Sequence, residues 1–447
     1  MDVKAYRKQF ARFASLSVLG TLGVSCYILA DTFFVAKGLG TNGLAALNIA
    51  IPVYNFIHGC GLMFGMGGAT KFSICKSGGA KKQTNEIFTN TVYLGILFGV
   101  LFALVGAFFS RPLAQFLGAD PAILSMTDTY LKWLLLFAPA FIMNDILLCF
   151  VRNDNNPLLA TNAMLVGSFS NIILDYVFIF PMKMGIFGAI FATGLSPIIS
   201  MLIMSLHWIK KENGFGLVRS RVNWGIIKTD FSLGFPSLIG QLASGIAMII
   251  FNMLILNLEG NVGVAAYGVT ANISLVVVGV YTGIAQGVQP LISDAYGSGD
   301  RKAIHLGLRY AMTTMAVLSI LIYLVLYVFA DPITGIFNSE NDPKLQQISV
   351  IGMKIYFTSV LAVGFNTIIA VYFTSIEKAL PAHILSLLRG LVLIAPIAFL
   401  LSALWKMTGI WLTYPVTEGV VAVLGYVVYR KTRISPNHIV SSSEQDS

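Results

Sequence analysis

The sequence predicts an all-α integral membrane protein with twelve transmembrane helices. We expect two six-helix bundles related by a pseudo-two-fold axis along the membrane normal. Of the 447 residues, 56% are hydrophobic and 11% are charged, and the mean hydropathy is +0.78. A soluble chain carries roughly 25% charged residues, so this chain has too few to cover a surface that faces water. Long apolar runs recur along it, and its two halves repeat one another.

The apolar runs place the spans in order, since about 20 residues of helix are needed to cross a bilayer. Several runs exceed that length, which predicts tilted or bent helices. Prolines and glycines inside the runs, such as Pro52 and Pro290, are bend points. The predicted spans are 13–36, 44–74, 87–110, 127–151, 159–181, 186–209, 229–257, 262–291, 304–330, 348–374, 380–402 and 408–429.

The two halves share motifs at a constant spacing. The segment "GTNGLAAL" at 40–47 aligns with "GNVGVAAY" at 260–267, an offset of 220 residues. The same offset places "SGGAKK" (77–82) on "GSGDRK" (297–302). Because the repeat holds an even number of spans, both halves keep the same orientation across the membrane, with a cleft between them.

We therefore expect four regions along the chain. They are an N-terminal lobe at 1–209, a cytoplasmic linker at 210–228, a C-terminal lobe at 229–433 and a polar cytoplasmic tail at 434–447. Most of the 29 Lys and Arg residues fall in segments on the same side as both termini, and cytoplasmic loops carry such an excess. This predicts a multi-pass protein of the cell membrane with both termini in the cytoplasm.

A carboxylate inside an apolar span is costly unless it is paired, protonated or bound to a cation. The acids deep in the spans are Asp31, Asp145, Asp175 and Glu418. Asn171 lies four residues before Asp175, so both side chains share one helical face, and Thr193 follows on the next, antiparallel span. If the first span packs against the fifth and sixth, Asp31 joins these three residues in one polar cluster.

Two carboxyl groups that share a dry site cannot both stay charged at low cost. Either one of them binds a proton, or a small hard cation such as Na⁺ binds among the oxygens of Asp31, Asn171, Asp175 and Thr193. Both outcomes describe a site for a coupling ion, and the sequence does not separate H⁺ from Na⁺. The remaining alternative is a hydrogen-bonded pair that fixes the register of the helices. No other cofactor is expected.

Other polar residues of the spans have two interpretations each. Asp145, beside Asn144, lies either in the same cavity or near the cytoplasmic mouth. Glu418 is interpreted as packing against polar groups of its own lobe, and the alternative is a second titrating site. His58 is interpreted as a buried neutral imidazole with a hydrogen-bond partner, and the alternative is a proton relay. The neutral groups that could orient a ligand in the cleft include Gln241, Asn252 and Gln286.

Taken together, "LADTFFVAKGLGTNGLAALNIAIP", the two loop motifs and "FVRNDNNPLLAT" resemble the multidrug and toxic compound extrusion (MATE) transporters, in particular the DinF-like and MepA-like bacterial branch. The resemblance covers essentially the whole chain. It implies two six-helix bundles arranged as a V and export of organic cations driven by an inward flow of H⁺ or Na⁺. It also implies that Asp31, Asn171, Asp175 and Thr193 bind the ion.

One departure concerns the NorM-like branch, which has a glutamate in the seventh helix after an "LG-P" motif. Here "LGFPSLIGQLAS" supplies Ser244 at about that place, so a sodium site of that kind is not expected in the C-terminal lobe.

The sequence thus predicts a monomeric, secondary active multidrug exporter surrounded by membrane lipids. It would exchange small organic, often cationic, compounds for H⁺ or Na⁺ by alternating access. The alternative is a lipid-linked sugar flippase of the wider MOP superfamily, against which we count a lack of Lys and Arg deep in the spans. An enzyme is not expected, because no HExxH, GxSxG or cysteine–histidine group occurs. The net charge of +9 falls in short loops rather than on one face, so no nucleic-acid partner is expected.

Overall fold

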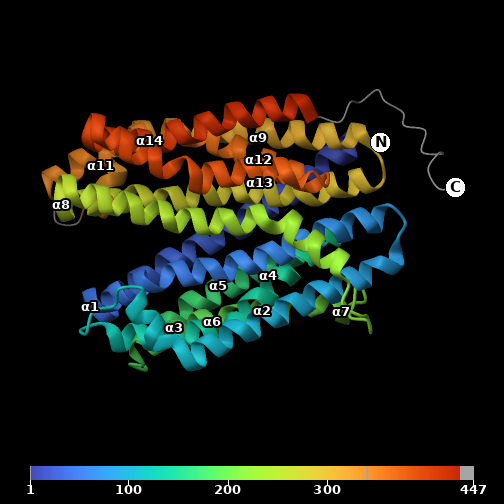
Figure 1. The fold of residues 1–447 in the computed structure, drawn as a ribbon, viewed down its shortest axis with the longest axis horizontal. Coiled ribbons are helices and arrows are strands. Elements are labelled where there is room, and N and C mark those ends of the chain that lie inside the picture. Colours follow the sequence, from blue (N-terminus) through green and yellow to red (C-terminus); the bar gives the residue numbers. More distant parts are fainter. Residues whose placement is uncertain (1, 339–340, 433–447) are drawn as a thin grey trace.

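The computed structural model describes residues 2–338 and 341–432, and it contains helices and no strand within those ranges. Figure 1 shows two bundles that lie side by side. Helices α1–α7 make up most of one bundle, and helices α8–α14 make up the other. The predicted all-helical membrane class is confirmed, whereas the predicted tail at 434–447 lies outside the described residues.

The helices follow one another with short connections. They are α1 (Val3–Ser77), α2 (Lys81–Phe116), α3 (Leu124–Leu136), α4 (Ala138–Asn153), α5 (Pro157–Ile179), α6 (Gly185–Met204), α7 (Leu206–Ile209), α8 (Trp224–Gly297), α9 (Arg301–Val328), α10 (Ala330–Phe337), α11 (Pro343–Tyr356), the 3-10 turn η1 (Phe357–Ser359), α12 (Val360–Ser375), α13 (Ala379–Leu387), the π segment η2 (Leu388–Val392) and α14 (Ile394–Thr432). Because α8 begins at Trp224, the last five residues of the predicted linker are helical.

Helices α1 and α8 are each interrupted by a glycine whose backbone other residues rarely adopt. Gly40 has φ 69° and ψ −159°, and Gly260 has φ 65° and ψ −156°. On α1 the hydroxyl groups of Tyr27 and Tyr54 lie 2.5 Å apart, at nearly equal distances along the chain from Gly40. The two parts of α1 therefore run back along one another as a hairpin.

The backbone repeats at the offset predicted from the motifs. Gly40 and Gly260 are 220 residues apart and have nearly the same φ and ψ. Gly79 (φ 85°) and Gly299 (φ 74°) are separated by the same offset, and each follows one of these long helices. The internal repeat is thus present in the local geometry as well as in the sequence.

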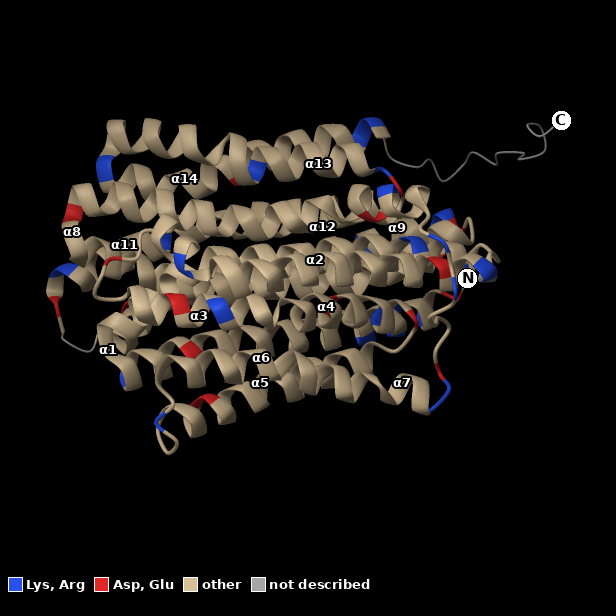
Figure 2. Cartoon of the chain, turned by 60° about the horizontal axis from the view of Figure 1, so that its bottom comes forward, with Lys and Arg blue, Asp and Glu red and all other residues tan. Residues whose placement is uncertain are grey.

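Eight helices in the described ranges are long and apolar enough to cross a membrane, or nine if the bent pair α3–α4 counts as one span. Three of them contain breaks, at Gly40, at Gly260 and at Trp405–Lys406, so a long helix of this kind can hold two spans. The count of twelve remains a prediction. Figure 2 shows most charged residues toward the two ends of the molecule, with a largely uncharged middle between them.

The two bundles contact each other toward the end at which the chain begins. A Cβ atom at Gly283 of α8 would lie 2.5 Å from the Cα of Val18 on α1, so only a residue without a side chain allows this approach. Thr21 donates a hydrogen bond to the carbonyl of Gly279 at 2.8 Å. Further hydrogen bonds join the bundles near this end: Arg152 to Gln286 (2.8 Å), Asn153 to Gln289 (2.9 Å) and Lys71 to Glu377 (2.6 Å).

At the same end, Asp154 fastens the segment between α7 and α8 to the first bundle. Its carboxylate accepts hydrogen bonds from Lys76, from His207 Nε2 at 2.8 Å and from the backbone N–H of Gly214. Burial disfavours the charged form, but these hydrogen bonds outweigh it and hold the pKa of Asp154 below its ordinary value. The ionised carboxylate therefore stabilises the folded protein.

We expect Gly40→Ala and Gly260→Ala each to lower the unfolding temperature in detergent, because this backbone conformation costs a side-chain residue on the order of 1–3 kcal/mol. No neighbouring atom lies within 4 Å of a Cβ at either position, so the effect isolates backbone strain. The matched control is Gly268→Ala, a helical glycine with equally open surroundings. Equal melting temperatures for all three variants would show that the breaks are unstrained.

We expect Asp154→Asn to lower the free energy of unfolding by about 1–3 kcal/mol at pH 7, the usual size for hydrogen bonds to a charged group. The pKa of Asp154 is depressed in the fold, so its stabilisation is present above the unfolded value near ~4 and is lost as the pH falls through the folded value. Thermal melts of parent and variant should thus converge in acid. Glu212→Gln, in the same cluster but on an exposed side chain, is the control. A constant difference at every pH would contradict the ionic origin.

Candidate functional site

The central feature of the first bundle is a direct contact between two acids. Asp31 of α1 and Asp175 of α5 are 8% and 0% exposed, and their carboxyl groups lie close enough to interact directly. Two ionised carboxyl groups have acceptors but no donor, so a hydrogen bond between them can form only when one of the two carries a proton. The pair as folded therefore accommodates one shared proton.

Asn171 and Thr193 complete the predicted cluster. With its amide oriented to satisfy both ends, Asn171 donates to Asp175 Oδ2 at 3.0 Å and accepts from the backbone N–H of Thr193 at 3.2 Å. Tyr130 of α3 lies close enough to the Thr193 hydroxyl group to interact with it. The structure thus brings together all four residues that the sequence singled out, and it adds a tyrosine that the sequence did not distinguish from ordinary core aromatics.

Close packing of α5 on α6 and on α1 positions these side chains. At Gly167 of α5, one turn before Asn171, a Cβ atom would lie 3.2 Å from the carbonyl oxygen of Ser196 on α6. The Ser196 hydroxyl group donates to the carbonyl of Gly167 at 3.0 Å. On α1, Gly23 faces Leu165 of α5 in the same way. These small residues let the three helices approach closely enough for their polar groups to meet.

A second polar pair lies in the same bundle. His58 Nδ1 of α1 and Asp145 Oδ2 of α4 are 2.8 Å apart, with side chains 22% and 5% exposed. The ring of Tyr54 lies one turn away, 4.8 Å from the imidazole between centroids. His58 therefore has a carboxylate in close contact with one ring nitrogen. Asp145 contacts this histidine rather than the cluster around Asp31, and Asn144 beside it is buried.

Glu418 is neutralised by groups of its own bundle. Its carboxylate accepts from Arg389 Nε at 2.5 Å and from Asn366 Nδ2 at 2.7 Å, and it is 1% exposed. This matches the interpretation that Glu418 packs against polar groups. It also corrects the expectation that no Lys or Arg lies deep in the spans, because Arg389 of η2 lies inside the bundle, where the carboxylate compensates its charge.

The cleft residues have mixed environments. Gln286 forms a hydrogen bond with the buried Arg152, so it joins the bundles. Gln241 and Asn252 on α8 are half-buried. The sequence analysis passed over Asp230, which is fully buried near the start of α8 and accepts a hydrogen bond from Thr91 of α2 at 2.7 Å. Asp230 is the second residue of the predicted span 229–257, whereas α8 begins at Trp224 and so places this acid deeper in the helix than the predicted span does.

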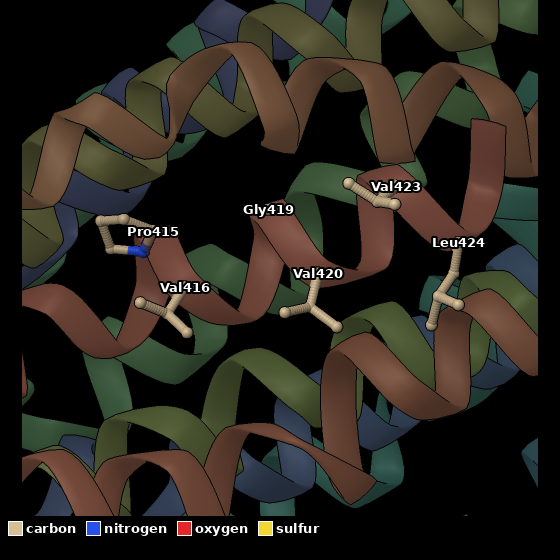
Figure 3. Close-up of a pocket in the computed structure, with 6 residues that line it drawn as sticks. All are labelled: Pro415, Val416, Gly419, Val420, Val423 and Leu424. Carbon is tan, nitrogen blue, oxygen red and sulfur yellow. The ribbon is translucent and has the colours of Figure 1, made fainter. Parts of the chain in front are cut away.

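Figure 3 shows a hollow on the surface of α14. Its lining is apolar throughout: Pro415, Val416, Gly419, Val420, Val423 and Leu424. Several of these side chains are well exposed, and none carries a group that can bind a proton or a metal ion. The hollow is therefore not a candidate ion site.

Comparison with known proteins agrees with this architecture. The family model MatE matches residues 17–177 and 236–400. The multidrug export protein MepA of Staphylococcus saprophyticus is 25% identical over 94% of this chain and 93% of its own, and MepA of Staphylococcus aureus (strain MRSA252) is 24% identical over the same shares.

Solved structures show the same fold. An outward-facing multidrug resistance MATE transporter of the MOP superfamily superimposes with a TM-score of 0.89 at 21% identity, covering 95% of each chain. A MOP superfamily transporter from Pyrococcus furiosus gives 0.88 at 22% identity, with 95% of each chain covered. The Vibrio cholerae MATE transporter VcmN gives 0.88 at 22% identity, covering 96% of this chain and 97% of that one.

The family model spans most of the chain, both halves included, and the folds agree over nearly its full length. These matches are with transporters and not with enzymes. The chain belongs to the MatE family, the multidrug and toxic compound extrusion family of membrane transporters.

Proposed function

We propose that this chain is a secondary active multidrug exporter. It exchanges organic, often cationic, compounds for a cation that moves inward, and it acts as a monomer in the cell membrane with both termini in the cytoplasm. Membership of the MatE family and similarity to proteins named as multidrug exporters support the substrate class. The predicted lobes at 1–209 and 229–433, joined by the linker at 210–228, are the units that move.

The observation that carries this proposal is the contact between the buried carboxyl groups of Asp31 and Asp175. One shared proton makes such a contact favourable, which supports H⁺ as the coupling ion. Sodium would replace that proton and take the carboxylate oxygens together with the amide and hydroxyl oxygens of Asn171 and Thr193 as ligands. These four residues therefore form the ion site, and H⁺ is the favoured coupling ion.

Helix α1 is the element that connects the ion site with the contact between the bundles. It carries Asp31 toward one end and, toward the other, Val18 and Thr21, which pack against α8. Loss of the shared proton leaves two negative charges side by side in an apolar interior, which favours a shift of α1 relative to α5. Such a shift changes the contact with α8, so ion binding and bundle separation are linked.

The linkage is reciprocal, because a cation that stabilises one arrangement of the bundles must weaken the binding of a drug that prefers the other. The bundles meet at the end where the chain begins, which is the cytoplasmic end in this proposal. The described arrangement then corresponds to a state open to the outside, in which external protons reach Asp31 and the drug leaves.

A lipid-linked sugar flippase of the MOP superfamily is the second candidate. The half-buried Arg389 favours it, because a lack of Lys and Arg deep in the spans was the argument against a flippase. Glu418 compensates the charge of Arg389, however, so this arginine attracts an anionic headgroup less strongly. Reconstituted protein that scrambles a fluorescent lipid-linked sugar, and does not export ethidium, would support the flippase.

We expect Asp31→Asn and Asp175→Asn each to reduce ethidium efflux from membrane vesicles by roughly tenfold or more, within the usual range of coupling between two ligands. An amide retains the size of the side chain but cannot alternate between a neutral and a charged form. The measurement is efflux driven by an imposed pH gradient and, separately, by an imposed sodium gradient.

Asp120→Asn, which changes an exposed acid outside the spans, is the matched control. Thermal melts of all variants show whether the fold is retained. Efflux at the parental rate in the two site variants would refute the ion site, and efflux driven by sodium alone would refute the priority of the proton.

A further inference from the structure

We propose that His58 and Asp145 form a second proton-binding station in the N-terminal bundle. In this proposal the hydroxyl groups of Tyr27 and Tyr54 connect the station to the Asp31–Asp175 pair. The proposal rests on the proposed function with H⁺ as the coupling ion, and it supplies the inner part of the route that the proton takes through the bundle.

The station has the geometry of a proton acceptor with a fixed partner. Asp145 Oδ2 lies 2.8 Å from Nδ1 of His58, so we assign the hydrogen of the neutral imidazole to Nδ1, the nitrogen that faces the carboxylate. Nε2 is then the acceptor that binds an incoming proton. The resulting imidazolium is compensated by the charge of Asp145, the charged group that acts on this ring.

Two tyrosines bridge the distance between the pairs. Tyr27 lies one helical turn before Asp31, Tyr54 lies one turn before His58, and their hydroxyl groups are hydrogen-bonded at 2.5 Å across the α1 hairpin. Tyr27 is close enough to Asp31, Asp175 and Asp145 to interact with all three electrostatically. A tyrosine hydroxyl group both donates and accepts, so each can receive one proton while it releases another.

The proton balance of the transfer is simple. One proton leaves the Asp31–Asp175 pair, the hydroxyl groups of Tyr27 and Tyr54 each pass one on, and Nε2 of His58 gains one. Bridging water or a small rotation of the rings covers the step at each end of the tyrosine pair. Release of the proton from Nε2 to the cytoplasm restores the neutral imidazole.

The position of His58 provides the exit. Its neighbour Gly59 packs directly on Leu238 and Gln241 of α8, so His58 lies beside the contact between the two bundles. Its side chain is 22% exposed although that of Asp145 is 5% exposed. When the bundles separate at the cytoplasmic end, this edge of α1 is the part of the chain that becomes accessible.

The groups around His58 distinguish the His58–Asp145 pair from an ion pair that has only a structural role. The groups in contact with the ring are Tyr54 on its own helix and Phe141 and Asp145 on α4, and the neighbouring Gly59 packs against Leu238 and Gln241 of α8. Asp145 is the charged member of this set. An imidazole in this setting changes its charge in response to pH instead of being held permanently by several ionic partners.

The test uses the full-length protein reconstituted in liposomes. His58→Gln keeps a hydrogen-bond donor for Asp145 but cannot take up a proton at neutral pH, and Tyr54→Phe keeps the ring and removes the hydroxyl group. We expect both variants to bind ethidium with the parental affinity, measured by fluorescence polarisation. We expect efflux driven by a pH gradient to fall about fivefold or more, a size typical of coupling between sites. The pH profile of His58→Gln should also lose the inflection that titration of the imidazole contributes.

The control is His305→Gln, on α9 of the other bundle, which should behave as the parent protein does. Parental efflux and an unchanged pH profile in both test variants would overturn the station, as would an equal loss of binding and efflux. If His58→Gln does not fold, Tyr54→Phe decides the question by the same measurements. Failure of the proposed function is recognised separately, because the parent protein would then show no efflux driven by a pH gradient.

Discussion

The contact between the buried carboxyl groups of Asp31 and Asp175 is the interaction on which the rest of the N-terminal bundle depends. Close packing of α1, α5 and α6 places the two carboxyl groups in an apolar interior, where a single proton makes their contact favourable. Two unit charges about 4 Å apart repel by about 4 kcal/mol at an effective dielectric constant of ~20. An energy of that size changes an equilibrium constant by about a thousandfold, which is ample to bias the arrangement of the bundles.

Helix α1 connects this repulsion at the acid pair to the contact between the two bundles. One continuous helix carries the acid near its break at Gly40 and the small residues that pack against α8 closer to its beginning. The packing there is tight, because at Gly283 the backbone of α8 lies directly against the backbone of α1. A displacement of α1 cannot be absorbed by adjustment of side chains, so it alters the contact between the bundles.

The sequence predicted the features that depend on chemistry within one segment. It predicted the helical membrane class, the repeat and the meeting of Asp31 with Asn171, Asp175 and Thr193, because periodicity and the cost of buried charge constrain them. It did not predict features that depend on contacts between distant segments. Arg389 was not recognised as a charged residue deep in the spans, because only its contact with Glu418 explains how its charge is accommodated there. Tyr130 looks like any core aromatic until Thr193 is found beside it.

The two bundles share a backbone plan but differ in how they treat buried charge, and this difference makes their roles unequal. At the offset of the repeat, Phe251 stands where Asp31 stands, and it packs against Tyr267 with 5.5 Å between ring centroids. Glu418, a buried acid of the second bundle, is held by an arginine that does not lose its proton. The acid pair of the first bundle can therefore change its charge in steps of one proton, whereas the Arg389–Glu418 pair keeps its charge. An asymmetric response of this kind lets one bundle move against a fixed partner, although both descend from the same repeat.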